Sequence, residues 1–189
     1  MFKIYAMTPL KWAAMLLTVA LLGGCSDYHY KNYQGDWAPE QLKPYDLSDN
    51  ASDAALVYFD TIRYRALGVP YHRLLLATDV DGQRIKGAGR RSILDVSGEQ
   101  ALKLKPGKHS LRWCWLSMNA LGTGGAMCNF AATDVEFQPG QRYVVTFRTD
   151  DSIKGPPGRQ VQEITVQSSI KNLDTKEVIF PPASMAQTE

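Results

Sequence analysis

Short apolar segments separated by turn residues dominate the chain from residue 54 to residue 180. They are rich in β-branched and aromatic residues, and several alternate between apolar and polar positions, which is typical of half-buried strands. The segments are residues 55–59, 74–80, 83–86, 92–96, 101–104, 109–116, 129–137, 142–148, 161–166 and 176–180. This pattern predicts an all-β domain with the architecture of a small β-sandwich or barrel.

Turn residues reinforce this pattern. Asp81-Gly82 favours a two-residue hairpin, and Pro106-Gly107 and Pro139-Gly140 favour tight turns before strands. The stretch 119–126, which holds three glycines, is expected to form a flexible loop between two neighbouring strands.

Four aromatic residues share strand faces by period two. Trp113 and Trp115 lie on one face of their segment, and Tyr143 and Phe147 lie on one face of a later segment. We expect these rings to be core residues. The alternative is that they are exposed and form a platform for a sugar ring or a partner protein.

The first 24 residues have the parts of a secretory signal peptide. Lys3 and Lys11 supply positive charge, and the apolar run from Trp12 to Leu22 follows them. That run is too short for a membrane span, which needs about 20 residues. Gly23-Gly24 then supplies the small side chains that a signal peptidase accepts.

The four residues Leu22-Gly23-Gly24-Cys25 resemble the lipobox of bacterial lipoproteins. The resemblance implies cleavage before Cys25, acylation of that cysteine with palmitate-type chains, and a membrane-anchored product. In Gram-negative lipoproteins an Asp directly after the cysteine favours retention at the inner membrane. Here Ser26 takes that position and Asp27 follows it, so the resemblance implies the outer membrane, with the domain facing the periplasm.

The segments outside the β pattern complete the expected organisation. Residues 25–53 show neither helical nor strand periodicity, and we expect a lipidated N-terminus and flexible tether there. The tether is rich in aromatic residues, so a partner-binding peptide is the alternative. We expect residues 54–180 to form the β-sandwich domain and residues 181–189 a disordered tail.

The net charge of the mature chain argues against nucleic acid as a partner. The full chain has 21 Lys plus Arg and 19 Asp plus Glu, and loss of Lys3 and Lys11 with the signal leaves 19 of each. A mature chain with no net charge gives no electrostatic basis for binding nucleic acid.

Two cysteines remain once Cys25 carries lipid. Cys114 and Cys128 form an even pair, which in an oxidising compartment predicts a disulfide that clips two neighbouring strands. Two buried free thiols are the alternative. We expect no metal site, because there is no C-x-x-C spacing and His109 lacks a set of partner ligands.

Two stretches of the domain, residues 104–111 and 137–144, each run from an apolar residue through Pro-Gly and a polar pair into a strand. With the turn at 80–82, they resemble PEGA-type and related β-sandwich modules of bacterial envelope proteins, over residues 74–148. The resemblance implies an Ig-like or PEGA-like sandwich that acts as an accessory or binding module.

Candidate catalytic residues are few. The histidines are His29, His72 and His109, and there is no G-x-S-x-G motif. Residues 79–82 resemble the start of a calcium loop but lack its later ligands, so they favour a hairpin. We therefore expect a non-enzymatic module without a cofactor that binds an envelope protein. The alternative is a glycan or peptidoglycan binder, and an enzyme whose triad assembles on folding is a third hypothesis.

Overall fold

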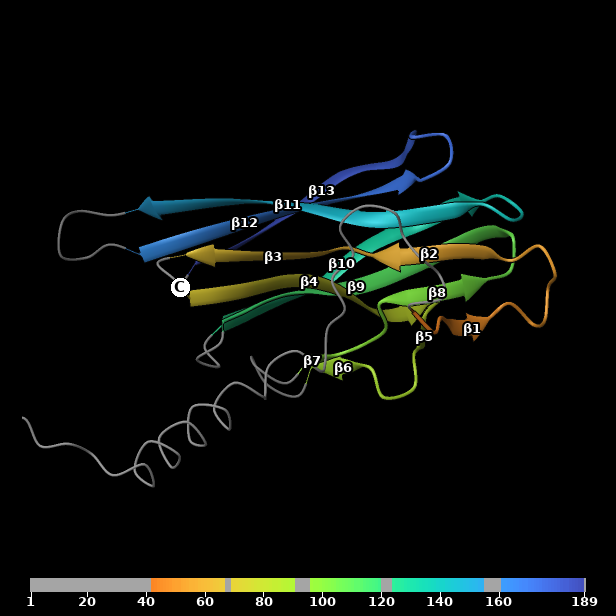
Figure 1. The fold of residues 1–189 in the computed structure, drawn as a ribbon, viewed down its shortest axis with the longest axis horizontal. Coiled ribbons are helices and arrows are strands. Elements are labelled where there is room, and N and C mark those ends of the chain that lie inside the picture. The colour runs from red at the N-terminus through yellow and green to blue at the C-terminus, as the bar shows by residue number, and fades with distance from the viewer. Residues whose placement is uncertain (1–41, 67–68, 91–95, 120–123, 155–160, 189) are drawn as a thin grey trace, which may run out of the picture. The chain divides into compact units, whose positions relative to one another are not determined.

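Long antiparallel hairpins build most of the domain in the computed structural model, which describes residues 42–66, 69–90, 96–119, 124–154 and 161–188. The strands, in chain order, are β1 Tyr45–Leu47, β2 Ala55–Phe59, β3 Thr61–Ala66, β4 Val69–Val80, β5 Gln83–Arg84, β6 Gly89–Arg90, β7 Val96–Ser97, β8 Ala101–Leu104, β9 Gly107–Asn119, β10 Gly124–Phe137, β11 Arg142–Lys154, β12 Val161–Asn172 and β13 Val178–Thr188 (Figure 1). The expected all-β class is confirmed.

The strands form two main sheets. Sheet A has the order β1-β8-β2-β11-β12-β13, and sheet B has the order β10-β9-β4-β3, with β5 added beside β4. In sheet A, β1 pairs with β8 and β2 with β11 in parallel, whereas the hairpin β11–β12 is antiparallel. The hairpins β3–β4 and β9–β10 of sheet B are antiparallel too. In Figure 1, β11, β12 and β13 run side by side above β4 and β9. A small pair, β6–β7, completes the topology.

The chain passes from sheet A to sheet B at Asp60, between β2 and β3. The Asp60 backbone N–H donates to Val145 O of sheet A at 3.0 Å, and its carbonyl accepts from Leu75 N of sheet B at 2.9 Å. Its carboxylate accepts from the Thr61 N–H at 2.8 Å. One half-buried residue thus ties both sheets at the corner of the sandwich.

The core lies between the two sheets. Alternate residues of β2, such as Val57 and Phe59, meet Leu75 and Trp113 from sheet B in one continuous apolar cluster. Strand alternation explains this arrangement, because residues i and i+2 point to the same face. The structure therefore supports a β-sandwich, with its hydrophobic layer where the period-two pattern placed it.

The domain extends beyond both expected boundaries. Residues 42–53 were expected in the tether, but β1 pairs with β8, and Leu42 packs against Tyr58 and Val144 on the outer face of sheet A. The expected disordered tail is also wrong for residues 181–188, which form most of β13 and pair with β12. A prolyl pair at 181–182 obscured this strand, because proline is tolerated in a sheet mainly at an edge.

The hairpins are also longer than expected. β9 runs to Asn119 and β10 begins at Gly124, so half of the expected flexible loop at 119–126 is strand, and its other half, residues 120–123, lies outside the described residues. β3 was not expected, because its charged residues masked its alternation. The expected strand 92–96 lies outside the described residues, except for Val96 in β7.

The corner residue Asp60 makes stability depend on pH. Burial raises the pKa of Asp60 to about 6 from 3.8, although the Thr61 N–H and Lys171 oppose the rise. The folded state then binds the proton more tightly than the unfolded chain, so the free energy of unfolding falls as pH rises from about 4 to about 6. We expect Asp60→Asn to remove this fall and to stabilise the domain by about 1–3 kcal/mol at pH 7.

Urea unfolding at several pH values measures this effect. Asn retains a side-chain oxygen that can accept from the Thr61 N–H, so the hydrogen bond is conserved. Asp150→Asn at an exposed position is the matched control and should show no such gain. Equal stability of wild type and Asp60→Asn at pH 7 would contradict the assignment.

Candidate functional site

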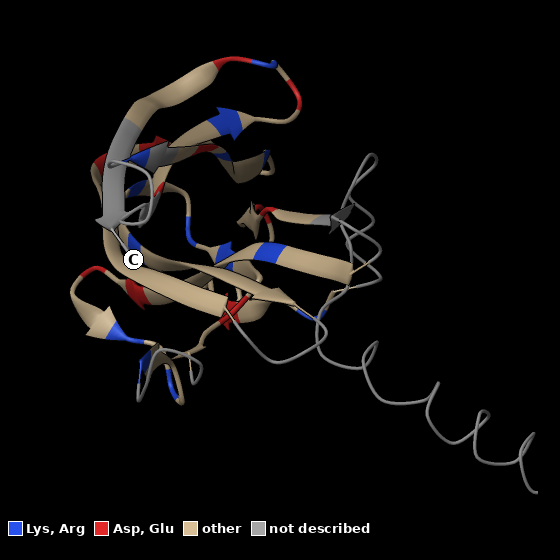
Figure 2. Ribbon diagram, turned by 90° about the vertical axis from the view of Figure 1, so that its left-hand side faces the viewer, with Lys and Arg blue, Asp and Glu red and all other residues tan. Residues whose placement is uncertain are grey.

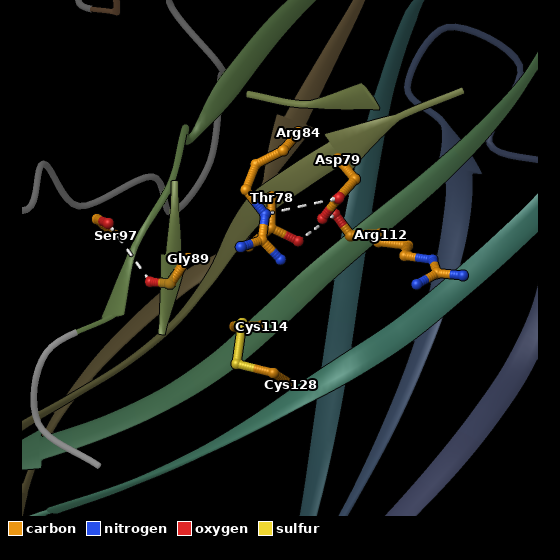
Figure 3. Close-up of a disulfide and its surroundings, with 8 residues drawn as sticks. All are labelled: Thr78, Asp79, Arg84, Gly89, Ser97, Arg112, Cys114 and Cys128. Carbon is orange, nitrogen blue, oxygen red and sulfur yellow. Dashed lines mark hydrogen bonds and ion pairs between the residues drawn. A yellow bond between two sulfur atoms is a disulfide. The ribbon is translucent and has the colours of Figure 1, made fainter. Parts of the chain in front are cut away.

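The expected disulfide joins Cys114 of β9 to Cys128 of β10 (Figure 3). Trp115 pairs with Met127 and Trp113 pairs with Phe130, so Cys114 faces two residues of β10 at a β-bulge. The second of these is Asn129, whose φ of 77° is a conformation that Asn tolerates better than most residues. The bond therefore clips two adjacent strands of sheet B, as the sequence predicted.

The four candidate platform rings belong to the core. Trp113, Trp115, Tyr143 and Phe147 are 0, 1, 1 and 5% exposed. Trp113 stacks on Phe130, with ring centroids 6.2 Å apart. The interpretation of these residues as an exposed platform is wrong, because the period-two face that they share is the inner face of each sheet. The glycan hypothesis loses the feature on which it rested.

A buried arginine that sequence reasoning missed links the sheets. Arg73 of β4 donates to both carboxylate oxygens of Asp151 of β11, at 2.9 and 3.2 Å, and to the Thr149 hydroxyl at 2.5 Å. Its guanidinium lies 5.8 Å from the Trp115 ring centroid. A charge directly before the apolar run 74–77 was the available sequence signal. The geometry assigns Arg73 a structural role between the two layers.

The histidine best placed for chemistry is held in a hairpin. His109 Nδ1 lies 2.7 Å from the Asp81 carboxylate, and Nε2 lies 2.7 Å from the Lys105 carbonyl oxygen. Asp81 and Gly82 have φ values of 51° and 77°, as a type I′ turn requires, so the hairpin interpretation of residues 79–82 is confirmed. His109 does not line the cleft described next, and neither does His72; His29 lies outside the described residues.

A cleft of about 500 Å³ opens where β10, the edge of sheet B, meets β13, the edge of sheet A. Pockets of this size are typical of ligand sites. Its lining residues are Thr133, Asp134, Val135, Glu136, Gln138, Gln141, Tyr143, Asn172, Thr175, Glu177, Ile179 and Phe180. The cleft thus combines an apolar floor with a rim of carboxylates and amides.

The rim of this cleft is acidic. Asp134, Glu136 and Glu177 are exposed, and the lining residues include no Lys or Arg. Asp134 sits at a second bulge of β10 with a φ of 54°. Over the rest of the domain, residues of both signs are interspersed along the strands (Figure 2). A rim of one sign in an otherwise mixed domain favours a cationic or hydrogen-bond-donating ligand.

A hydrogen-bond network fixes the base of the cleft. The Gln138 N–H donates to the Tyr143 hydroxyl at 2.8 Å, across the Pro139-Gly140 turn. Asn172 accepts from the N–H groups of Asp174 and Thr175 at 2.8 and 3.0 Å, and its amide donates to Gln141. Burial raises the pKa of Tyr143, and nearby carboxylates add to the rise against the Gln138 hydrogen bond. The phenol therefore stays protonated at physiological pH.

Comparisons with known proteins give no relative: no family model matches the chain, and neither a curated protein nor a solved structure matches it. Within the described part of the chain, no group of three His, Cys, Asp or Glu residues is placed to hold a metal ion. The described residues also contain no helix long and apolar enough to cross a membrane. Cys25, the expected lipidation site, lies outside the described residues.

Proposed function

We propose that the mature chain is an outer-membrane lipoprotein that acts as a non-enzymatic accessory module and binds a protein of the cell envelope. The lipobox-like residues before Cys25 support the anchor. The Cys114–Cys128 bond supports an oxidising compartment such as the periplasm, where disulfides persist. The resemblance to PEGA-type modules supports an accessory role.

The observation that carries the binding role is the acidic cleft between β10 and β13. Its open shape and its mixture of carboxylates, amides and apolar side chains suit a segment of another protein that presents basic and apolar residues. A rim of exposed charges contributes mainly to the rate of association and to selectivity, while the apolar floor contributes affinity. The disulfide leaves this surface open, since neither Cys114 nor Cys128 is among the residues that line the cleft.

The anchor is tested at its cysteine. We expect Cys25→Ala to abolish incorporation of labelled palmitate and to prevent maturation at that site, because the acceptor thiol is gone. Ser26→Asp is the matched variant, since it leaves the cysteine intact. It should retain the label but move from outer-membrane to inner-membrane fractions. A labelled Cys25→Ala protein would contradict the proposal.

Partner binding is tested by photo-crosslinking in intact cells. Benzoylphenylalanine replaces Glu136 in the cleft and, as the control, Asp150 on an exposed part of β11. We expect one discrete protein adduct from position 136 and none from position 150. Equal adducts from both positions, or none from position 136, would count against the cleft as the binding surface.

A further inference from the structure

A second surface site lies on the outer face of sheet A, where β11 and β12 pair without a bulge. Thr146 of β11 lies opposite Ser169 of β12, and their hydroxyl oxygens are 3.1 Å apart. Because alternate residues share a face, Arg148 and Lys171 project on the same side as this hydroxyl pair. Two hydroxyls and two cations therefore gather on one polar face.

The two cations flank the hydroxyl pair from opposite directions. Arg148 is two residues beyond Thr146 on β11, and Lys171 is two residues beyond Ser169 on the antiparallel strand β12. Each Cα is therefore displaced about 7 Å along its strand from the hydroxyls. The long side chains of Arg and Lys can cover that distance, so both charges can converge on a ligand held over Thr146 and Ser169.

A pocket of about 200 Å³ occupies this place. Its lining residues are Thr146, Phe147, Arg148, Gln167, Ser169, Lys171, Val178 and Pro182. At about 30 Å³ per water molecule, the volume accommodates a tetrahedral oxyanion with part of its hydration. Val178, which is 48% exposed, and Pro182 give the pocket one apolar side, which suits the organic part of an ester.

The charges of the pocket are available for a ligand. Arg142 and Lys154, elsewhere on β11, form ion pairs with Asp174 and Glu163. Among the described residues, Arg148 and Lys171 form no such pair. Two carboxylates bear on these cations: that of Asp60, which interacts electrostatically with Lys171, and that of Asp150, which is two residues after Arg148 on the same face of β11.

We infer that this pocket binds a phosphate group. Arg148 and Lys171 supply the positive charge, and the hydroxyls of Thr146 and Ser169 and the amide of Gln167 donate hydrogen bonds to the phosphate oxygens. The site lies on the opposite side of β13 from the acidic cleft, whose lining takes Ile179 and Phe180 from that strand. It is therefore independent of the proposed protein-binding surface.

The phosphate could belong to a soluble ester or to a lipid headgroup, and the test separates these sources. The full mature chain is held in zwitterionic micelles and titrated with inorganic phosphate, dihexanoyl phosphatidylglycerol or dihexanoyl phosphatidylcholine. Backbone amide shifts of Thr146 and Ser169 report binding. We expect saturable shifts with phosphate, phosphatidylglycerol or both, and none with phosphatidylcholine. Binding of phosphate alone indicates a soluble ester, and binding of phosphatidylglycerol alone indicates a lipid.

The variant Arg148→Gln with Lys171→Gln should weaken this binding at least tenfold. Arg84→Gln with Lys154→Gln removes the same charge from exposed positions outside the pocket and should leave the dissociation constant unchanged. Loss of affinity in both double variants would mean that binding depends only on the net charge of the protein, and this would overturn the proposed site. Absence of saturable shifts with either phosphate probe would overturn it as well.

Discussion

Trp113→Ala is expected to destabilise the domain by about 3–5 kcal/mol, the cost typical of replacing a buried tryptophan with alanine. The indole is fully buried in the continuous core. It stacks on Phe130 of β10, and its centroid lies 6.4 Å from that of Phe59 in sheet A. The substitution therefore opens a cavity that touches both layers, where neighbouring strands cannot collapse without breaking their ladders.

Urea unfolding, followed by far-UV circular dichroism, measures this loss. Arg112→Ala is the matched control on the same strand, because its side chain is exposed, and it should change stability by less than about 0.5 kcal/mol. Trp113→Phe should cost less than Trp113→Ala. It keeps an aromatic ring and removes the indole N–H, which is buried with no hydrogen-bond partner among the described residues. A stable Trp113→Ala variant would contradict the core assignment.

Sequence reasoning succeeded where local chemistry decides structure. Asp81-Gly82 favours a two-residue hairpin because both positions need positive φ, and the structure has both. β2 and β8 were predicted with their observed bounds, since each is a short apolar run between polar residues. The disulfide followed from the even pair of cysteines in a chain that we expect to be exported, an argument that needs no knowledge of the fold.

Sequence reasoning failed where pairing overrides local preference. β13 continues through two prolines because β12 supplies its partner along one edge. Arg73 lies between the sheets because Asp151, distant in sequence, compensates its charge there. No local pattern indicates such a pairing, so the sequence predicts a tail from residue 181 and assigns no role to Arg73.

The two surface sites share the same limitation. The acidic cleft takes residues from the end of β10, from the turn between β12 and β13, and from the start of β13, and only the sheet order brings these together. The phosphate pocket depends on the register of β11 against β12, which places Thr146 opposite Ser169. A shift by one residue would turn Lys171 and Ser169 towards the core. Sheet order therefore determines the cleft and register determines the pocket, and sequence reasoning reached neither.

Removal of the Cys114–Cys128 bond is expected to lower the free energy of unfolding by about 3 kcal/mol, as the chain-entropy model gives for a loop of about 15 residues. The cysteines are separated by 14 positions, and their strands already pair on both sides of the bulge. The bond therefore adds few contacts to the folded state, and its main effect is to restrict the unfolded chain. We expect Cys114→Ala with Cys128→Ala to fold to the same strand content but to unfold at lower urea.

Comparison of three samples separates the effect of the disulfide bond on stability from the effect of the two cysteine side chains. Reduced wild type and the double alanine variant should unfold at similar urea concentrations, both below oxidised wild type. Cys114→Ala alone is the control for packing, since Cys114 is buried and Cys128 half-buried, and it should resemble the double variant. If reduction lowers stability while far-UV circular dichroism also changes, the bond holds the β9–β10 register in the folded state, and the entropic account is wrong. Equal midpoints for oxidised and reduced protein would mean that the cross-link contributes nothing to the stability of this hairpin.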